Sequence, residues 1–356
     1  MNARRILLTI AFLVTAMTSD LCAQGFAGLG STAEGGFAVP TRGSKLAFPR
    51  DHGAHPNYRV EWWYITANLE GADGRTYGVQ WTLFRSALAP GNGDGWADPQ
   101  IWIGHAAITT IDGHYVAEKL GRGGTGQAGV EIAPFEAWID DWSMKQSLDE
   151  RGDPLSQIDL NASGTEFQYQ LTLSARTPLV LQGDKGYSVK SAKGQASYYY
   201  SQPFYEVRGS LSISGKAVQV SGKAWLDREW SSQPLADDQT GWDWFSLHLP
   251  SGDKIMAFRL RDGTSGFVSA NWITADGETR PMTRDDITME PLQFAKVEGR
   301  DIPVVWRIHV PGQQLDITTK PLNEQAWMKT STPYWEGPIA FSGSATGVGY
   351  LEMTGY

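Results

Sequence analysis

Cysteine is nearly absent from this sequence, and charged side chains are few. The single cysteine among 356 residues, Cys22, has no partner for an intrachain disulfide. Asp, Glu, Lys and Arg make up only 19% of the chain, and acidic residues outnumber basic ones by 39 to 30. The formal charge of −9 lacks the basic footprint of a nucleic-acid-binding protein, so no nucleic-acid partner is expected.

Long apolar runs and the common cofactor motifs are also missing. Beyond residue 23 no stretch approaches the about 18 uninterrupted apolar residues of a transmembrane helix, so we do not expect an integral membrane protein. There is no Gly-rich phosphate loop, Gly-x-Ser-x-Gly elbow, Cys-x-x-Cys pair or His-Glu-x-x-His motif. The sequence therefore gives no support to nucleotide, serine-hydrolase or zinc-protease chemistry, and we expect no cofactor.

The first residues have the pattern of a targeting segment. Arg4 and Arg5 form a positive start, residues 6–17 are apolar, and Ala23 offers a small residue for cleavage. This pattern predicts a signal peptide over residues 1–23. The mature protein is then expected to be periplasmic or secreted.

Two alternatives stay open for this segment. Leu21 is bulky for a cleavage consensus, which would suit an uncleaved N-terminal anchor. Acylation of Cys22 would instead make the protein a lipoprotein. Residues 24–45 begin rich in Gly, Ala and Ser without periodicity, and we expect a flexible leader there.

Aromatic and β-branched residues in short runs dominate the remainder. The chain has 15 Trp, 13 Tyr and 13 Phe, enough apolar surface for a large core or a ligand cavity. Several runs are separated by Asp-Gly pairs, which favour the positive-φ positions of hairpin turns. These pairs are Asp73-Gly74, Asp112-Gly113, Asp262-Gly263 and Asp276-Gly277. The pattern predicts an all-β protein.

An internal repeat divides the chain into two similar parts. Residues 62–69 resemble residues 242–249, and residues 214–227 resemble residues 342–352. The first match opens and the second closes each part, which predicts one antiparallel barrel duplicated. Chance similarity is the alternative.

The length also favours two domains, because 356 residues exceed the usual size of one. We place an N-terminal domain at residues 46–233 and a C-terminal domain at residues 238–356. The polar segment between them has the composition of a linker.

One expected strand carries two carboxylates. Strand alternation puts Trp225, Asp227 and Glu229 on one face. If a closed barrel shields that face, desolvation and mutual repulsion raise a carboxyl pKa and leave an acid able to donate a proton near neutrality. The structural alternative is an ion pair at the barrel rim with Arg228 or Arg208.

Polar residues crowd the segment before the first strand. His52 and His55, with Asp51 and Glu61 nearby, are residue types found in metal sites, but a segment interrupted by Gly and Pro fixes no ligand geometry. No metal is predicted. We expect Glu61 to pair with Arg59 across the barrel end, because buried charges persist only when paired.

A third cluster contains consecutive tyrosines. Tyr198 and Tyr200 present two phenols on one strand face, where they could orient a ligand or a water molecule. Aromatic faces also stabilise a developing positive charge by cation–π attraction. The alternative is that these rings fill a core.

Motifs spread along the chain carry a family resemblance. They are His55-Pro56, Glu61-Trp62-Trp63-Tyr64, Ala196-Ser197-Tyr198-Tyr199-Tyr200-Ser201, Trp225-Leu226-Asp227-Arg228-Glu229-Trp230-Ser231-Ser232-Gln233 and Tyr334-Trp335-Glu336-Gly337. Together they resemble the carotenoid 1,2-hydratase (hydroxyneurosporene synthase) and AttH-like secreted family, whose members are often described as secreted hydrolases. The resemblance covers nearly all of the chain beyond its N-terminal segment. It implies two consecutive lipocalin-like antiparallel β-barrels.

The resemblance also implies an acid catalyst at Asp227. In the hydratases an Asp at this position protonates an isoprenoid double bond, with a Tyr two residues earlier and a His and a Trp on an upstream strand. Here Trp225 stands at the Tyr position, and Tyr198 and Tyr200 fall approximately on the upstream pair. Three supporting residues thus differ, which favours another lipophilic ligand over a carotenoid. The AttH-like branch also implies an ABC transporter complex as a partner.

Three functions follow from these patterns. The leading hypothesis is an exported protein that binds a lipid or isoprenoid-like molecule and serves an ABC transport system. The second is a hydratase (hydro-lyase) or hydrolase in which Asp227 is the general acid and Glu229 or Tyr198 positions water. The third is a structural or assembly protein with filled barrels. The expected ligand-binding residues are Glu61, Trp62, Trp63, Tyr64, Tyr198, Tyr200, Trp225, Asp227, Trp242 and Trp244.

Overall fold

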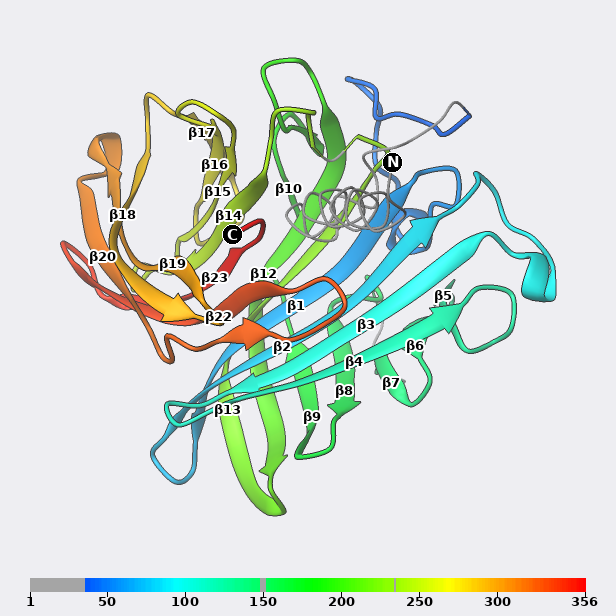
Figure 1. Cartoon of the computed structure of the whole chain (residues 1–356), viewed down its shortest axis with the longest axis horizontal. Helices are drawn as coiled ribbons and strands as arrows, with labels where there is room; N and C mark the ends of the chain where they lie inside the picture. Colours follow the sequence, from blue (N-terminus) through cyan, green and yellow to red (C-terminus); the bar gives the residue numbers. More distant parts are fainter. Residues whose placement is uncertain (1–35, 148–151, 234) are drawn as a thin grey trace, which may run out of the picture.

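Two curved antiparallel sheets lie side by side in the molecule (Figure 1). The structure, a computed structural model, describes residues 36–147, 152–233 and 235–356. One sheet nearly closes into a barrel and the other curls into a half-barrel, so the prediction of an all-β chain with two lipocalin-like barrels is confirmed. The expected signal peptide at residues 1–23, and the leader up to residue 35, lie outside the described residues.

The N-terminal sheet contains thirteen strands in the described part of the chain. They are β1 (Val60–Gly71), β2 (Thr76–Ala87), β3 (Gln100–Thr109), β4 (His114–Arg122), β5 (Ala128–Ile132), β6 (Phe135–Ile139), β7 (Trp142–Gln146), β8 (Gln157–Ser163), β9 (Phe167–Ser174), β10 (Val180–Leu181), β11 (Tyr187–Val189), β12 (Ala196–Ile213) and β13 (Lys216–Ser231). Their order is β4-β3-β2-β1-β13-β12-β9-β8-β7-β6-β5, and β10 and β11 pair with β12.

The C-terminal sheet contains ten strands over the same described ranges. They are β14 (Gly241–His248), β15 (Lys254–Arg261), β16 (Phe267–Ile273), β17 (Thr279–Thr283), β18 (Thr288–Val297), β19 (Arg300–Val310), β20 (Leu315–Pro321), β21 (Trp327–Met328), β22 (Tyr334–Gly343) and β23 (Gly347–Met353). Their order is β17-β16-β15-β14-β23-β22-β20-β19-β18, and β21 pairs with β22. Short 3-10 turns are η2 (Arg50–His52), η3 (Gly95–Ala97) and η4 (Pro311–Gln313).

The four Asp-Gly pairs lie in turns between adjacent antiparallel strands, as predicted. They connect β1 to β2, β3 to β4, β15 to β16 and β16 to β17. The positive φ that favours glycine in such turns occurs at Gly74 (77°) and Gly277 (92°).

The internal repeat occupies the same place in both sheets. Strand β1 pairs with β13, the last strand of its sheet, and β14 pairs with β23 in the same way. In the first ladder Tyr64 stands opposite Asp227, and in the second Trp244 stands opposite Glu352. The two sheets therefore share the pairing of their first and last strands, with equivalent residues opposite each other.

Side chains fill both barrels, and a third apolar cluster lies between the sheets. On β13, Leu226 and Trp230 point into the N-terminal barrel, whereas Trp225 points out of it and packs with Tyr64 and Trp244 of the third cluster. Because both faces of these strands are buried, apolar residues occur on both sides of them. The outer faces of the two sheets thus pack together and form a third apolar core, in addition to the cores of the two barrels.

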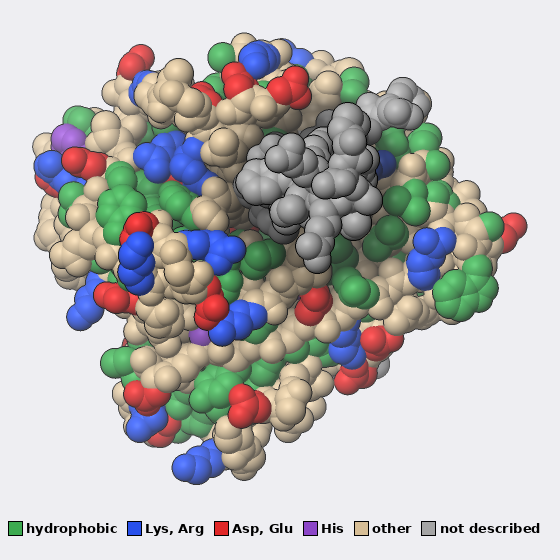
Figure 2. Space-filling model, viewed as in Figure 1, with side chains coloured by type: hydrophobic (Ala, Val, Ile, Leu, Met, Phe, Trp, Pro, Cys, Tyr) green, Lys and Arg blue, Asp and Glu red, His purple; other side chains and the backbone are tan. Residues whose placement is uncertain are grey.

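The surface and the described end of the leader add two observations. On the face shown in Figure 2, basic and acidic side chains are interspersed. The Ala38 amide donates to the Asn57 carbonyl (2.9 Å) and the Thr41 amide to the Tyr198 hydroxyl (3.0 Å), so residues 36–45 are tied to the N-terminal barrel. Within the described chain, no helix has both the length and the apolar character needed to span a bilayer.

Candidate functional site

A pocket lies between the two sheets, against the outer faces of β1, β2, β12, β13, β14, β15 and β23. Its free volume is about 70 Å³. It is lined by Trp62, Tyr64, Phe84, Lys190, Tyr199, Asp227, Glu229, Trp242, Trp244, Phe258, Leu260 and Glu352. Aromatic rings from both repeats therefore surround a small group of charged side chains.

Asp227 is the most buried acid of this pocket, with 3% of its surface exposed, and three side chains donate hydrogen bonds to it. The Tyr199 hydroxyl donates to Oδ2 (2.5 Å), and the Trp225 indole donates to Oδ1 (2.6 Å). The Ser201 hydroxyl also donates to Oδ1. Ser201 stands directly opposite Asp227 in the β12–β13 ladder, and Trp225 lies two residues earlier on the same face. Strand pairing, together with the alternation of side chains along β12 and β13, thus brings these donors to the carboxyl.

Burial and hydrogen bonding have opposite effects on the pKa of Asp227, and the effect of burial is larger. Desolvation raises its pKa, while hydrogen bonds from Ser201, Tyr199 and Trp225 lower it. The net result raises the pKa of Asp227 from 3.8 to about 7. Near neutral pH this carboxyl therefore exchanges its proton readily, as a general acid must.

Rings from both repeats surround the acid. The Trp244 indole donates to the Tyr199 hydroxyl (3.3 Å), which in turn donates to Asp227. Trp244 also stands edge-on to Tyr64, with ring centroids 5.4 Å apart, and to Trp225 at 6.3 Å. The C-terminal sheet thus completes the environment of an acid carried by the N-terminal sheet.

Glu229 lines the same pocket, but its charge is matched. Lys190 Nζ lies 2.7 Å from its Oε1, and the Ser197 hydroxyl donates to it. The ion-pair partner on this face is therefore Lys190 and not Arg228 or Arg208. The Lys190 ammonium lies 4.2 Å from the centroid of the Phe258 ring, which also shields it.

The structure divides the predicted site residues between two places. Trp62, Tyr64, Asp227, Glu229, Trp242 and Trp244 line the pocket, and Trp225 lies beside it. Glu61, Trp63, Tyr198 and Tyr200 point to the opposite side of their strands, into the N-terminal barrel. Placing Tyr198 as the residue that positions water for Asp227 is corrected, because its hydroxyl lies on the other face of β12 and contacts Thr41.

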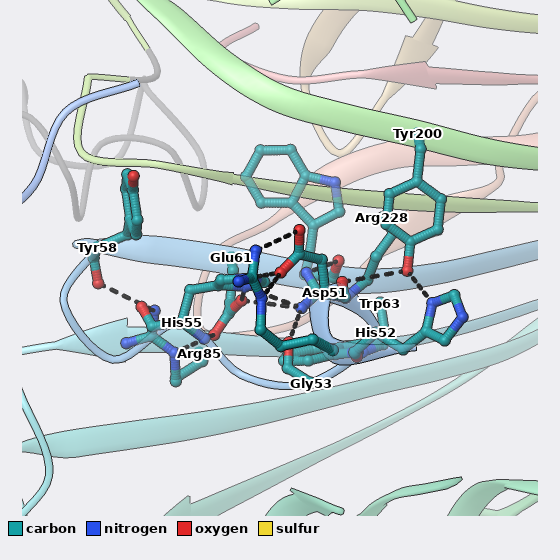
Figure 3. Close-up of polar contacts among 12 residues, drawn as sticks. Asp51, His52, Gly53, His55, Tyr58, Glu61, Trp63, Arg85, Tyr200 and Arg228 are labelled. Carbon is teal, nitrogen blue, oxygen red and sulfur yellow. Dashed lines mark hydrogen bonds and ion pairs between the residues drawn. The ribbon is translucent and has the colours of Figure 1, made fainter. Parts of the chain in front are cut away.

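Inside that barrel, Glu61 lies at the centre of a buried polar network (Figure 3). Arg228 Nη2 donates to Glu61 Oε2 (2.9 Å), and Arg85 Nε donates to Oε1. Burial alone would raise the pKa of Glu61, but the charges of Arg85 and Arg228 hold it well below its usual range. The partners of Glu61 come from neighbouring strands, so the expected pairing with Arg59 is replaced by these two arginines.

The two histidines before β1 take part in the same network. His55 Nδ1 lies 3.0 Å from Glu61 Oε2, and His52 Nδ1 lies 2.7 Å from the Tyr200 hydroxyl (Figure 3). Over residues 36–147, 152–233 and 235–356, no group of three or more His, Cys, Asp or Glu side chains is arranged to hold a metal ion. These residues tie the segment before β1 to the barrel wall.

Six pocket residues were not selected from the sequence: Phe84, Lys190, Tyr199, Phe258, Leu260 and Glu352. Lys190 comes from the loop after β11, and no sequence motif pointed to it as a site residue. Tyr199 lies between the two tyrosines that were selected. Glu352 had a usable signal, because the repeat aligns it with Asp227.

The fold and the pocket define a class: a protein of two lipocalin-like barrels with a buried acid in an aromatic pocket between them. The model of the AttH-like family matches residues 39–356, and the chain belongs to that family. No functionally curated protein matches the sequence.

Solved structures agree with this assignment. An AttH-type protein from Nitrosomonas europaea is 32% identical over 90% of this chain and 100% of its own, with a TM-score of 0.78. Kievitone hydratase from Nectria haematococca is 17% identical over 94% of this chain and 96% of its own, with a TM-score of 0.67. CghA, solved with Sch210972, is 14% identical over 83% of this chain and 88% of its own, with a TM-score of 0.53. The last two similarities concern the fold alone.

Proposed function

We propose that this protein binds a lipophilic, unsaturated small molecule between its two sheets and that Asp227 protonates it, as in a hydratase. The observation that carries the proposal is a buried carboxyl with a pKa of about 7, surrounded by indole and phenol rings. Proton transfer to a double bond leaves a carbocation. The faces of nearby rings stabilise such a cation by about 1–2 kcal/mol each when water is excluded.

The size of the pocket limits what enters it. An apolar cavity of about 150 Å³ holds benzene, and the free volume here is about 70 Å³. We therefore propose that only the reacting end of the ligand reaches Asp227 unless the lining rings move. Trp62 and Trp242, which are only partly buried, would contact the part that stays outside.

Untargeted mass spectrometry tests the reaction. The purified protein is incubated in ¹⁸O-labelled water with a lipophilic extract of its native host and, separately, with kievitone, the compound named for one structural neighbour. We expect a compound that gains one labelled water, at a rate that falls above about pH 7 as Asp227 ionises. Asp227→Asn should lower this rate on the order of 10²–10⁴-fold. Full turnover by this variant would eliminate the mechanism.

We propose a carrier role as the second candidate, in which the same pocket binds a lipid or isoprenoid-like molecule and serves an ABC transport system. The largely aromatic lining supports it. Native mass spectrometry of protein taken from its own host tests it. A bound lipophile that is retained and unchanged in both wild type and Asp227→Asn favours the carrier, whereas empty protein opposes it. A purely structural role would not explain why Asp227 is a buried carboxyl with a raised pKa.

We also propose that the protein acts outside the cytoplasm. The support is the sequence of residues 1–23, with its basic start and apolar run. Mass analysis of the mature N-terminus from cell fractions tests this. Cleavage after Ala23 in a periplasmic or secreted fraction is the expected result.

A further inference from the structure

A second hollow, larger than the pocket, lies between the same two sheets, and we call it the outer groove. Its lining comes from β10, β11 and the turn between them on one side and from β16 and β17 on the other (Figure 1). Beside it the Asn271 amide on β16 donates to the side-chain oxygen of Gln182 after β10 (2.5 Å), which ties the two walls together. Every lining residue except Met282 is at least partly exposed, so the groove is open to solvent.

The outer groove continues the Asp227 pocket along one sheet. In the β15–β16 ladder Leu260 stands opposite Phe267, and Phe258 stands opposite Ser269. Leu260 and Phe258 line the pocket, whereas Phe267 and Ser269 line the groove. Side chains that stand opposite each other in a ladder share one face of the sheet and lie about 5 Å apart. The two hollows are therefore neighbours on the outer face of the C-terminal sheet, one strand apart.

The wall formed by the N-terminal sheet makes the same step. Val189 lines the groove, and the next residue, Lys190, lines the pocket. Between the hollows Phe267 packs in the same apolar cluster as Leu260. An apolar surface thus leads from the open groove to the aromatic pocket.

The two hollows differ greatly in size. The free volume of the groove is about 1030 Å³, against about 70 Å³ for the pocket. Pockets for small molecules typically measure about 300–1,000 Å³, so the groove has room for most of a ligand whose reacting end alone reaches Asp227. Apolar side chains of both sheets line it, among them Leu181, Tyr187, Val189, Phe267 and Pro281. The combined shape fits an elongated, largely apolar molecule.

Basic side chains surround the groove. Arg42, Lys185 and Arg284 line it, and Asp184 is the one acid among its described lining residues. This excess of basic residues reverses the balance of the whole chain, in which 39 acidic residues face 30 basic ones. Arg42 is paired with Asp184, whereas Lys185 and Arg284 form no ion pair with a described residue. The groove therefore offers two unmatched positive charges to a ligand.

Arg284 is fixed in place at the edge of the groove. Its guanidinium donates to the Ser265 carbonyl (2.9 Å) and to the Gly266 carbonyl, and neutral acceptors of this kind leave its charge uncompensated. Asp262 lies near Arg284, but the amide and hydroxyl of Thr264 donate to its carboxylate, and it does not line the groove. A guanidinium held in this way is well suited to an anionic group.

We propose that the outer groove binds the remote part of the ligand of the Asp227 pocket, and that this ligand is an elongated lipophile ending in an anionic group near Lys185 and Arg284. This inference rests on the proposed binding of a lipophile between the sheets. The double bond lies at Asp227, and the apolar chain passes Leu260 and Phe267. Contacts with the remote end are the same before and during the reaction, so they affect KM rather than kcat.

Calorimetry with two matched probes tests the charge. The probes are monomeric oleate and oleyl alcohol, which have the same chain but differ in charge. We expect oleate to bind more tightly, and the double variant Lys185→Gln/Arg284→Gln to weaken oleate binding about 3- to 10-fold without affecting the alcohol. Equal binding of both probes, or oleate binding that the variant leaves unchanged, overturns the inference.

The control variant is Arg208→Gln/Lys216→Gln, at exposed residues of the long β12–β13 hairpin (Figure 1). It removes the same net charge from residues that do not line the groove, and it should bind oleate like wild type. Equal weakening in the control would trace the effect to overall charge and overturn the inference. Melting curves check that both double variants are folded.

NMR tests whether the two hollows form one site. Oleate should shift the ¹⁵N–¹H signals of the Trp242 and Trp244 indoles in the pocket and of the Gly266 and Phe267 amides in the groove, with one common midpoint. Shifts confined to the groove would mean a separate surface site and overturn the inference.

The ¹⁸O-water assay separates this inference from the proposed function. For the compound that gains water, Lys185→Gln/Arg284→Gln should raise KM about 3- to 10-fold with kcat nearly unchanged. Hydration of a neutral compound with an unchanged KM overturns the inference and leaves the hydratase function intact. Oleate binding that meets both expectations, in a protein that adds water to nothing in the extract, supports the groove and opposes the hydratase.

Discussion

At the scale of single residues, Asp227 shows how a β-ladder both supports and perturbs an acid. Three donors favour its ionised form, yet the absence of water around it has the larger effect on its pKa. The protein therefore keeps an acid whose charged form destabilises the fold. Such a cost is typical of groups retained for chemistry.

This cost predicts how stability changes with pH. In the unfolded chain Asp227 ionises near pH 3.8, but in the folded protein only near pH 7. Stability is therefore lost as pH rises through this window, by a total of about 4 kcal/mol, and the loss is complete above it. Asp227→Asn removes the titration and should gain stability relative to wild type between pH 4 and pH 8. Urea unfolding at the two pH values measures the change.

The matched control for this titration is Asp285→Asn, in the exposed turn after β17. Its stability relative to wild type should vary little over the same pH range. If Asp227→Asn behaves like this control, the carboxyl of Asp227 is not desolvated in solution.

Single-residue alternation predicted part of this site. It correctly placed Trp225, Asp227 and Glu229 on one face of β13. It did not show that Tyr199 rather than Tyr198 faces Asp227, because that depends on how β12 pairs with β13. The pairing contains a register shift between Gln202 and Tyr205, which no local pattern reveals.

At the scale of elements, β1 buries both of its faces. One face contributes Tyr64 to the pocket, and the other contributes Glu61 to the buried network of the N-terminal barrel. Arg85 stands directly opposite Glu61 on β2, and Arg228 comes from β13 on the other side. The sequence predicted a buried ion pair for Glu61 but supplied the wrong partner, because cross-strand neighbours are distant in sequence.

Removing the charge of Glu61 should be costly. Glu61→Gln leaves Arg85 and Arg228 buried without a counter-charge, and breaking a buried pair in this way typically costs about 3–5 kcal/mol. Urea unfolding should show a lower midpoint with an unchanged slope. Glu131→Gln, at an exposed residue of β5, is the control and should have little effect. A loss below about 1 kcal/mol for Glu61→Gln would show that water reaches the network.

At the scale of the whole molecule, the repeat predicted duplication but not how the copies pack. Both barrels are filled, and the pocket lies where their outer walls meet. Trp62 and Trp242 have equivalent positions in the two halves, and both line that pocket. Packing of one unit against the other is a tertiary property, so the sequence left the choice between barrel lumen and cleft open.

This shared wall predicts that the halves lose stability together. Trp244→Ala removes a buried ring that contacts Tyr64 and Trp225 of the other sheet, at a cost of about 3–5 kcal/mol. Native-state hydrogen exchange should then accelerate in β1 and β13 as well as in β14 and β23. Trp96→Ala, at a ring that is 76% exposed, is the control. Faster exchange confined to β14 and β23 would mean that the sheets open independently.

The wall between the sheets also differs in kind from a barrel lumen. In the described chain no strand of one sheet pairs with a strand of the other, so side chains close this boundary. The diameter of a closed barrel is set by its strand number and tilt. A space bounded by two separate sheets has no such fixed diameter, because its width depends on the side chains that face each other across it. If the proposed ligand binds there, rotation of those rings would let molecules of different width reach Asp227 without breaking a strand pairing.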